Sequence, residues 1–299
     1  MPAVVPTSDD FNALVTRVAS LESRVTKLEQ AQPPSIVPSV AAKLHGVTTL
    51  VWNDEFDTLS VASCRANGGK GGAKWYDGVP NGPTNPAWMG GGIAANAYKA
   101  QGSILTITLQ KGQDGFNLTS DDGSGSGFFL DVNQFVEFRA SLMGWDSFWS
   151  FPKDYITGIG VNPPDNSTYV AEYDFLEHDH GAQIDLTTLH KNTNNGSGVQ
   201  DLTAVLSLPS GNNEWHTWGF WRTASNLLVY KDDVLTGTFQ TWSSGGARGS
   251  TPGTLMTWSP GNLPLAIIIG AGRGGVLGGN SEPCPDVVTM QVDYVRVWK

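Results

Sequence analysis

The sequence contains few cysteines and no long apolar run. Its 299 residues include two cysteines, Cys64 and Cys284, and neither lies at the short Cys/His spacing that marks a metal site. No stretch reaches the roughly 18 apolar residues of a membrane-spanning helix. The first residues lack the basic start and apolar core of a signal peptide. We therefore expect no membrane segment, and we leave open whether the two cysteines pair.

Basic residues are also scarce. The chain has 18 Lys and Arg against 28 Asp and Glu, which gives a formal net charge of −10. A nucleic-acid backbone is bound by clustered basic side chains, so we expect no nucleic-acid partner and favour a neutral ligand. Glycine (36 residues) and tryptophan (11 residues) are numerous. Glycine suits the turns of an all-β protein, and tryptophan suits stacking on flat apolar ligands as well as core packing.

Residues 1–32 differ from the rest of the chain. Apolar residues recur there at alternating intervals of three and four, the seam of a coiled coil: Phe11, Leu14, Val18, Leu21, Val25 and Leu28. A helix of this length is marginal alone in water, so we expect it to associate with partner chains. The alternative is a helix that packs on its own domain. A Pro-rich linker is predicted over residues 33–45.

Two copies of one short pattern bear on the oligomeric state. The segments "RVASLE" (17–22) and "RVTKLE" (24–29) lie seven residues apart and resemble a short trimerisation motif. In that motif each Arg bridges to a Glu of the neighbouring helix. Val at one seam position with Leu at the other instead favours two strands. We therefore expect a homotrimer, with a dimer as the second possibility.

From residue 46 onward the pattern is short apolar strands separated by Gly, Asn, Pro and Asp turns, without a helix-length amphipathic pattern. This favours an all-β fold, a concanavalin-like jelly-roll β-sandwich spanning residues 46–299. The Gly-rich region 65–95 is too long for a simple turn, and loops of this length often carry function. Trp75 and Trp88 within it are candidates to flank a cleft.

The segment "VAEYDFLEHDH" (170–180) is an acidic strand. In a regular strand Glu172 and Asp174 share a face, whereas Glu177 points to the other face. A β-bulge at Phe175–Leu176 would return Glu177 to the face of the other two acids. Glu172 and Glu177 would then lie about 5–5.5 Å apart, the carboxyl separation of retaining glycosidases.

Other interpretations of this segment are a solvent-facing acidic strand or a calcium site. The neighbouring His178 and His180 share a strand face, which is a workable metal-ligand spacing. The segment has no Lys or Arg to offset the crowded carboxylates. The repulsion between them is better explained by catalysis, for which carboxylates alone suffice.

The sequence Glu172-Tyr-Asp174-Phe-Leu-Glu177 resembles the ExDxxE signature of glycoside hydrolase family 16, the laminarinase, agarase and carrageenase group. The resemblance implies that Glu172 is the nucleophile, that Asp174 assists it, and that Glu177 is the acid/base. Other segments resemble strands of the family and occur in the family's order: 50–57, 104–110, 136–142, 145–149, 214–223, 227–233, 263–272 and 292–298. The resemblance spans roughly residues 46–299.

Further site residues follow from this resemblance and from position in the chain. Trp149 and Trp145 are expected to contact the substrate, as is His190 in the strand after the acidic one. Trp88 and Trp258 are candidates for outer sugar contacts. Catalysis in the family needs no cofactor, but the resemblance implies a structural calcium, for which Asp293 is the matching position. Residues 167–171 and the absence of Pro from "WDSFW" depart from the family pattern and leave the sugar undefined.

The resulting expectation is a retaining endo-β-glycosidase acting on a polysaccharide: a β-1,3-glucan, a galactan or a bacterial exopolysaccharide. A non-catalytic carbohydrate-binding or receptor-binding protein is the main alternative, since the same sandwich serves lectins. A transglycosylase would use the same intermediate. We expect an extracellular or virion-associated protein: a bacteriophage depolymerase, or a bacterial enzyme exported without a recognised signal peptide.

Overall fold

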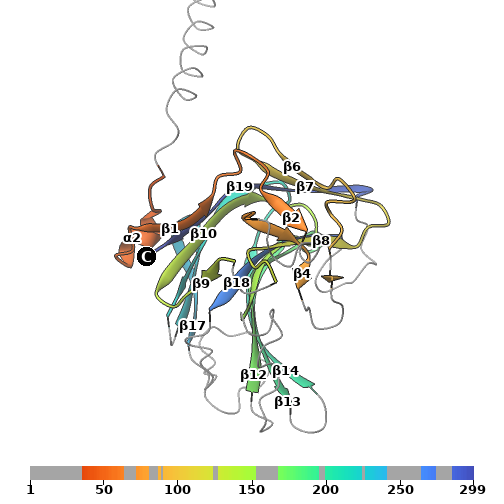
Figure 1. Ribbon diagram of the computed structural model, residues 1–299. Helices are drawn as coiled ribbons and strands as arrows, with labels where there is room; N and C mark the ends of the chain where they lie inside the picture. The colour runs from red at the N-terminus through yellow and green to blue at the C-terminus, as the bar shows by residue number, and fades with distance from the viewer. Residues whose placement is uncertain are drawn as a thin grey trace, which may run out of the picture. The chain divides into compact units, whose positions relative to one another are not determined.

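The chain divides into two units, Met1–Val37 and Pro38–Lys299. The predicted coiled coil over 1–32 lies outside the described residues, as do Cys64, Cys284 and Trp258. None of the helical segments within the described ranges has the length and hydropathy to cross a membrane. The computed structural model (Figure 1) describes residues 36–63, 72–80, 87–88, 90–123, 127–152, 168–194, 199–223, 226–240, 264–273 and 285–299.

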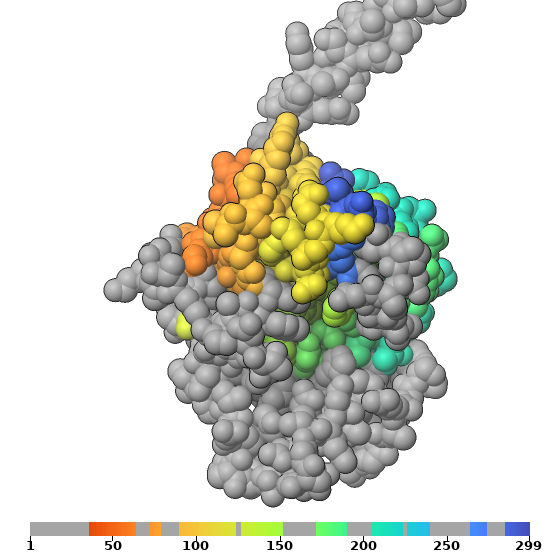
Figure 2. Space-filling view, turned by 90° about the vertical axis from the view of Figure 1, so that its right-hand side faces the viewer, coloured from red at the N-terminus to blue at the C-terminus, as the bar shows by residue number. Residues whose placement is uncertain are grey.

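The second unit is built on two large antiparallel sheets. The first has eight strands, and β1 (Leu50–Asp54) pairs with the last strand beside the main path. The path runs β17 (Val234–Gln240), β16 (Asn226–Lys231), β15 (Trp215–Arg222), β10 (Gln134–Ser141), β19 (Val287–Trp298), β7 (Leu105–Gln110) and β6 (Tyr98–Ala100). In Figure 2, the start of β19 (blue) lies beside the yellow segment at the end of β7, as the pairing of Val287 with Gln110 requires.

The second sheet has nine strands and carries the acidic segment. Its path runs β14 (Val199–Pro209), β13 (Ile184–Asn194), β12 (Thr168–Asp179), β11 (Ser147–Pro152), β18 (Leu265–Gly272), β8 (Gly115–Thr119), β3 (Trp75–Asp77) and β2 (Val61–Ser63). β9 (Phe129–Leu130) also pairs with β18. The short strands β4 (Val79–Pro80) and β5 (Ala87–Trp88) form a separate pair.

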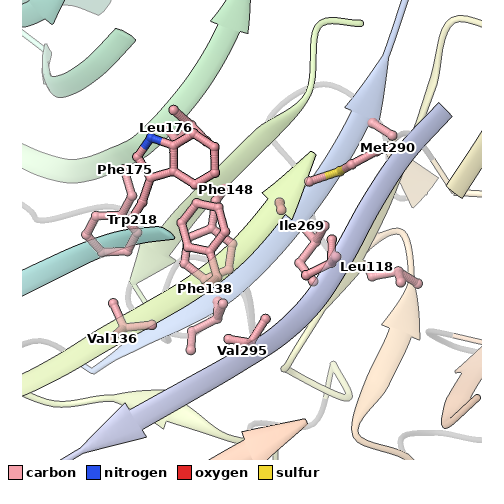
Figure 3. Close-up of a cluster of buried hydrophobic side chains, with 14 of the residues drawn as sticks. Leu118, Val136, Phe138, Phe148, Phe175, Leu176, Trp218, Ile269, Met290 and Val295 are labelled. Carbon is pink, nitrogen blue, oxygen red and sulfur yellow. The ribbon is translucent and has the colours of Figure 1, made fainter. Parts of the chain in front are cut away.

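The core lies between the two large sheets (Figure 3). Phe138 of β10 stacks on Phe148 of β11 with ring centroids 4.0 Å apart, and Phe220 of β15 lies 4.9 Å from Phe175 of β12. Each fully buried aromatic side chain contributes about 1.5–3 kcal/mol through the area that it removes from water. The two facing layers confirm the predicted all-β sandwich.

A short helix lies where the sequence pattern predicts a linker. α2 (Val40–Leu44) begins at Ser39, whose hydroxyl accepts from the Ala42 N–H at 3.1 Å. Ala41 and Ala42 are buried against Phe135 and Trp298 on the outer side of the first sheet. The compact unit therefore begins at Pro38, before the predicted boundary at residue 46. Small alanine side chains let this single turn pack closely, and so short a turn carries no helical periodicity to recognise.

Candidate active site

β12 contains a bulge at the predicted place. Toward β13, Asp174 pairs with Thr188 and Glu177 pairs with Leu186. Two residues of β12 therefore lie between these pairs, opposite a single residue of β13. On the other side, one step along β11 faces two along β12, between Leu176 and Asp174. Phe175 is the extra residue. The predicted bulge at Phe175–Leu176 is confirmed.

The bulge separates apolar from acidic side chains. Phe175 and Leu176 are consecutive, yet both are buried in the core between the sheets (Figure 3). Glu172, Asp174 and Glu177 line one open cavity. Glu177 therefore shares the surface of the other two acids, as predicted. The separation of about 5–5.5 Å between the outer carboxyl groups stays a prediction.

Glu177 is held by side chains from both sides of β12. The indole Nε1–H of Trp145 donates to its Oε1 at 3.3 Å, and the hydroxyl of Thr188 donates to its Oε2, also at 3.3 Å. Trp145 precedes β11, and Thr188 belongs to β13. Both contacts fix the direction in which the Glu177 carboxylate faces the cavity.

A glycine shapes the floor of the cavity. A Cβ atom placed on Gly270 of β18 would lie 2.3 Å from Ser147 Oγ and 2.5 Å from Asn117 Oδ1, both of which also line the cavity. The same Asn117 oxygen accepts from Trp149 Nε1–H at 3.4 Å. Trp149 lines the cavity but is only 4% exposed, so it presents an edge rather than a broad stacking face.

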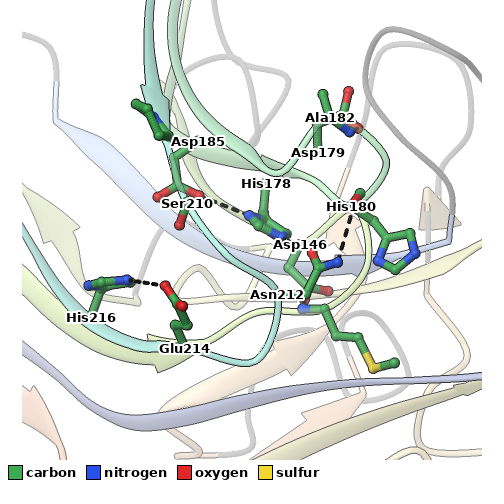
Figure 4. Close-up of polar contacts among 12 residues, drawn as sticks. Asp146, His178, Asp179, His180, Ala182, Asp185, Ser210, Asn212, Glu214 and His216 are labelled. Atoms are coloured by element: carbon green, nitrogen blue, oxygen red, sulfur yellow. Dashed lines mark hydrogen bonds and ion pairs between the residues drawn. The ribbon is translucent and has the colours of Figure 1, made fainter.

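A buried polar cluster lies behind the Glu177 end of β12 (Figure 4). The ring nitrogens of His178 contact Asp185 Oδ1 at 2.9 Å and Asn212 Oδ1 at 2.8 Å, and Lys231 Nζ donates to Asp185 Oδ2 at 2.9 Å. Burial lowers the pKa of His178, but its hydrogen bonds to the two oxygens and the negative charges of Asp185 and Asp146 together outweigh burial and raise that pKa above its ordinary value. Because both ring nitrogens are used, His178 has none to offer a metal.

Asp146 connects this cluster to the cavity. It lies between Trp145 and Ser147 in the sequence, and its main-chain oxygen accepts from the His178 N–H at 2.7 Å. Its carboxylate accepts from the N–H groups of Met143 and Gly144. Burial nevertheless raises the pKa of Asp146 to about 6. This short segment therefore holds the Trp145 backbone against β12.

The remaining predicted residues have varied placements. His190 pairs with Glu172 in the strand register, and Trp88 lies in β5, but their side chains are outside the description. Asp293 Oδ2 accepts from Arg139 Nη1 at 2.6 Å, and the structural calcium expected at this residue stays a prediction. Across the described ranges, no group of three His, Cys, Asp or Glu side chains is arranged to hold a metal.

Sequence reasoning missed Thr188, Asn117, Ser147 and Gly270. Only Gly270 had a usable signal, since a glycine directly after the apolar run 265–269 and within the same expected strand indicates a close approach of other atoms to the strand. The other three become neighbours of the acids only through strand pairing, which a single sequence does not display.

Comparison with known proteins places this geometry in a known fold. No protein-family model matches the sequence. LamAcat of Zobellia galactanivorans has a similar structure, with a TM-score of 0.57 at 21% identity over 84% of this chain and 98% of that chain. The laminarinase of Flavobacterium sp. UMI-01 gives a TM-score of 0.56 at 20% identity over 84% of this chain and 100% of its own.

Two further proteins that resemble this chain have glycosidase activities in their names. A non-specific endo-β-1,3(4)-glucanase of glycoside hydrolase family 16 matches with a TM-score of 0.57 at 20% identity, over 89% of this chain and 98% of that chain. The keratan-sulfate endo-1,4-β-galactosidase of Sphingobacterium multivorum is 26% identical over 266 residues, which are 84% of this chain. The match spans 55% of that protein, about half its length. The resemblance predicted from the ExDxxE motif is thus supported: the chain has the β-sandwich fold of the family 16 glucanases.

Proposed function

We propose that this chain is a retaining endo-β-glycosidase that cleaves a polysaccharide. The observation that carries the proposal is the bulged strand β12, which brings Glu172, Asp174 and Glu177 into one open cavity. The shared fold and the activities named for its relatives support the same reaction class. An open cavity suits internal cleavage, because a long chain can lie across it.

The proposed reaction has two steps. Glu172 attacks the anomeric carbon while Glu177 gives its proton to the leaving glycosidic oxygen, which yields a covalent glycosyl-enzyme. Glu177, now ionised, then removes a proton from water, and the water oxygen replaces Glu172 at the same carbon. Two inversions give net retention. Asp174 lies between the two in the strand, where its negative charge disfavours ionisation of a neighbouring carboxyl group.

The cavity also bears on the substrate. Its described lining is three acids, two tryptophans, Asn117, Ser147 and Gly270, and this set contains no Lys or Arg. A sulfated sugar would meet repulsion from the acids of this described lining, where no residue carries a positive charge. We therefore propose a neutral polysaccharide at the reacting position, with laminarin-type β-1,3-glucan first and a neutral galactan or exopolysaccharide next.

The first test is digestion of a panel containing laminarin, agarose and keratan sulfate. Reducing ends should appear from a neutral polysaccharide, and the anomeric proton of the new end should first have the β configuration. Glu177→Gln should lower the rate on laminarin by about 10³-fold or more, because general acid–base catalysis typically contributes 10²–10⁴-fold. Far-UV circular dichroism should be unchanged.

Glu214→Gln is the matched control, since this carboxylate is 61% exposed and is not part of the cavity lining. Its activity should equal that of the wild type. Full activity in Glu177→Gln would refute the assignment of Glu177. Binding to the panel without release of reducing ends would instead identify a carbohydrate-binding protein, and transfer to added oligosaccharide would identify a transglycosylase.

We also propose that the heptad seam over residues 11–28 makes a homotrimer. Three copies of one weak polysaccharide site gain avidity on a repetitive substrate. That arrangement suits a virion-borne depolymerase facing a bacterial exopolysaccharide. Immunodetection of the protein in purified virions tests this location, and its absence there would favour an exported bacterial enzyme.

A further inference from the structure

The two oxygens of Glu177 face donors of different kinds. Oε1 accepts from the Trp145 indole, whose N–H can only donate. Oε2 accepts from the Thr188 hydroxyl, which can either donate or accept after a rotation about its C–O bond. A protonated Glu177 therefore keeps its carbonyl oxygen, the stronger acceptor, toward the Trp145 indole only if the new proton is on Oε2.

Trp145 has little freedom to turn away from Oε1. Its main-chain N–H donates to the Gly272 carbonyl oxygen at 3.0 Å. A Cβ atom placed on Gly272 would contact the Trp145 ring at 3.5 Å, so the indole packs directly over this glycine. Asp146, the next residue, is fully buried and anchored to two backbone N–H groups.

The bulge explains why Thr188 reaches Glu177. The direct partner of Thr188 across the strands is Asp174, and the direct partner of Glu177 is Leu186. The Thr188 hydroxyl therefore contacts Glu177 diagonally, along the cavity face. Threonine is stiff about χ1 because of its branched Cβ, so its hydroxyl is held near Oε2 at little entropic cost.

We propose that Trp145 and Thr188 are positioning residues that confine the catalytic proton of Glu177 to Oε2. This inference rests on the proposed glycosidase function. In the first step the Oε2 proton passes to the glycosidic oxygen as its bond to the anomeric carbon breaks and the Glu172 bond forms. In the second step the proton of the attacking water returns to Oε2. The Thr188 hydroxyl accepts from the protonated form and donates to the ionised one.

A titration without substrate tests the hydrogen-bond arrangement. In a nitrogen-labelled sample, one of the 11 tryptophan indole N–H resonances should disappear in Trp145→Phe and so be assigned. That resonance should shift with pH in the wild type and stay constant in Glu177→Gln. In Thr188→Val the midpoint of this pH-dependent shift should move to higher pH, because the ionised form of Glu177 loses a hydrogen-bond donor. Thr188→Ser, which keeps the hydroxyl, should restore it.

Kinetics then test the catalytic consequence. Thr188→Val should lose about tenfold in kcat/KM on laminarin, as expected for one hydrogen bond to a charged group. The alkaline limb of its pH profile should move to higher pH. On a dinitrophenyl β-laminaribioside the loss should be less than about threefold, since that leaving group departs without a proton. Trp145→Phe should show the same contrast between the two substrates.

The two proposals fail in different ways. The positioning role would be overturned by an equal loss of kcat/KM on both substrates in Thr188→Val. It would also be overturned if the Trp145 indole resonance had the same pH dependence in the wild type and in Glu177→Gln. Absence of hydrolysis by the wild type, together with the expected indole titration, would refute the glycosidase proposal and leave the Glu177 hydrogen bonds established. If Thr188→Val does not fold, Thr188→Ala gives the same comparison.

Discussion

Gly270 forms part of the cavity floor because it has no side chain. A methyl group there would press against Ser147 and Asn117, and Asn117 in turn holds the Trp149 indole. Gly270→Ala should therefore lower kcat/KM on laminarin by about tenfold or more, with an unfolding cost of about 1–3 kcal/mol for overpacking. Steady-state kinetics and urea unfolding check the two effects separately.

Ser147→Ala provides the control for this prediction, because it removes the atom nearest to the added methyl group. The double variant should regain part of the activity that Gly270→Ala loses. If Gly270→Ala keeps wild-type activity, the cavity floor does not contact the sugar.

Asp146 should make stability depend on pH. Its pKa is about 6 in the folded chain against an ordinary value of 3.8, so between these values the folded state binds more protons than the unfolded state. Stability should fall by about 3 kcal/mol as pH rises through this window. His178, with its raised pKa, stabilises below its ordinary value of 6.5 and loses that contribution as pH rises further.

Asp146→Asn isolates the first contribution, because a neutral amide oxygen can still accept from Met143 and Gly144. The variant should match the wild type near pH 4, where Asp146 is neutral, and be more stable than the wild type near pH 7, as measured by urea unfolding. Asp286→Asn should not alter the dependence of stability on pH between 4 and 7, because the ion pair with Lys111 lowers the pKa of this exposed carboxylate and its titration lies below that range. A wild-type slope that Asp146→Asn leaves unchanged would contradict the assignment.

The bulge in β12 decides which face of the strand Glu177 points to, because one extra residue reverses the alternation of side chains. The shared surface of Glu172, Asp174 and Glu177 could be predicted from the sequence because the motif is local. A regular strand would point Glu177 to the opposite face, and this mismatch indicates an extra residue between Asp174 and Glu177. The pairing of β12 with β11 and β13 is not local, so the contacts of Trp145 and Thr188 with Glu177 could not be predicted. α2 was missed because Pro38 and the prolines before it predict a linker.

Deleting Leu176 should convert the bulge into a regular strand. Glu177 would then lie an even number of residues from Glu172 and still face the cavity. Phe175 would be the one residue between Asp174 and Glu177, and it would face the core. Loss of one buried Leu should cost about 2–5 kcal/mol of unfolding free energy, while hydrolysis persists at a reduced rate.

Deleting both Phe175 and Leu176 is the contrasting variant. Glu177, the proposed acid/base, would then lie an odd number of residues from Glu172 and point into the core, so activity should be abolished along with stability. Thermal unfolding and reducing-end release measure both deletions. Equal activity in the two variants would disprove the parity argument.

At the scale of the whole molecule, the sequence predicts two parts with separate tasks. The sandwich class was predictable from short strands and turns over residues 46–299, since each strand is a local pattern. The order of strands in each sheet was not, because it joins segments distant in sequence, such as β1 with β19. The oligomeric state stays a prediction from the heptads.

Sedimentation equilibrium of the full chain should give three times the 31.9 kDa chain mass. Leu21→Asp places a charge in the apolar seam and should yield monomers, because burying an unpaired carboxylate is costly. Ser23→Asp, outside the seam, should remain trimeric. If the wild type sediments as a monomer, the trimer is wrong and the alternative, a helix that packs on its own domain, is favoured.

β19 has a further consequence during synthesis on the ribosome. It pairs with β10 along one edge and with both β7 and β1 along the other, so the first sheet lacks a central strand until Val287–Trp298 has been made. By then Glu172, Asp174 and Glu177 have long emerged, together with the apolar inner face of β12. These three acids therefore emerge before the sheet that completes their domain, and the nascent chain must be kept from aggregating until β19 has been made.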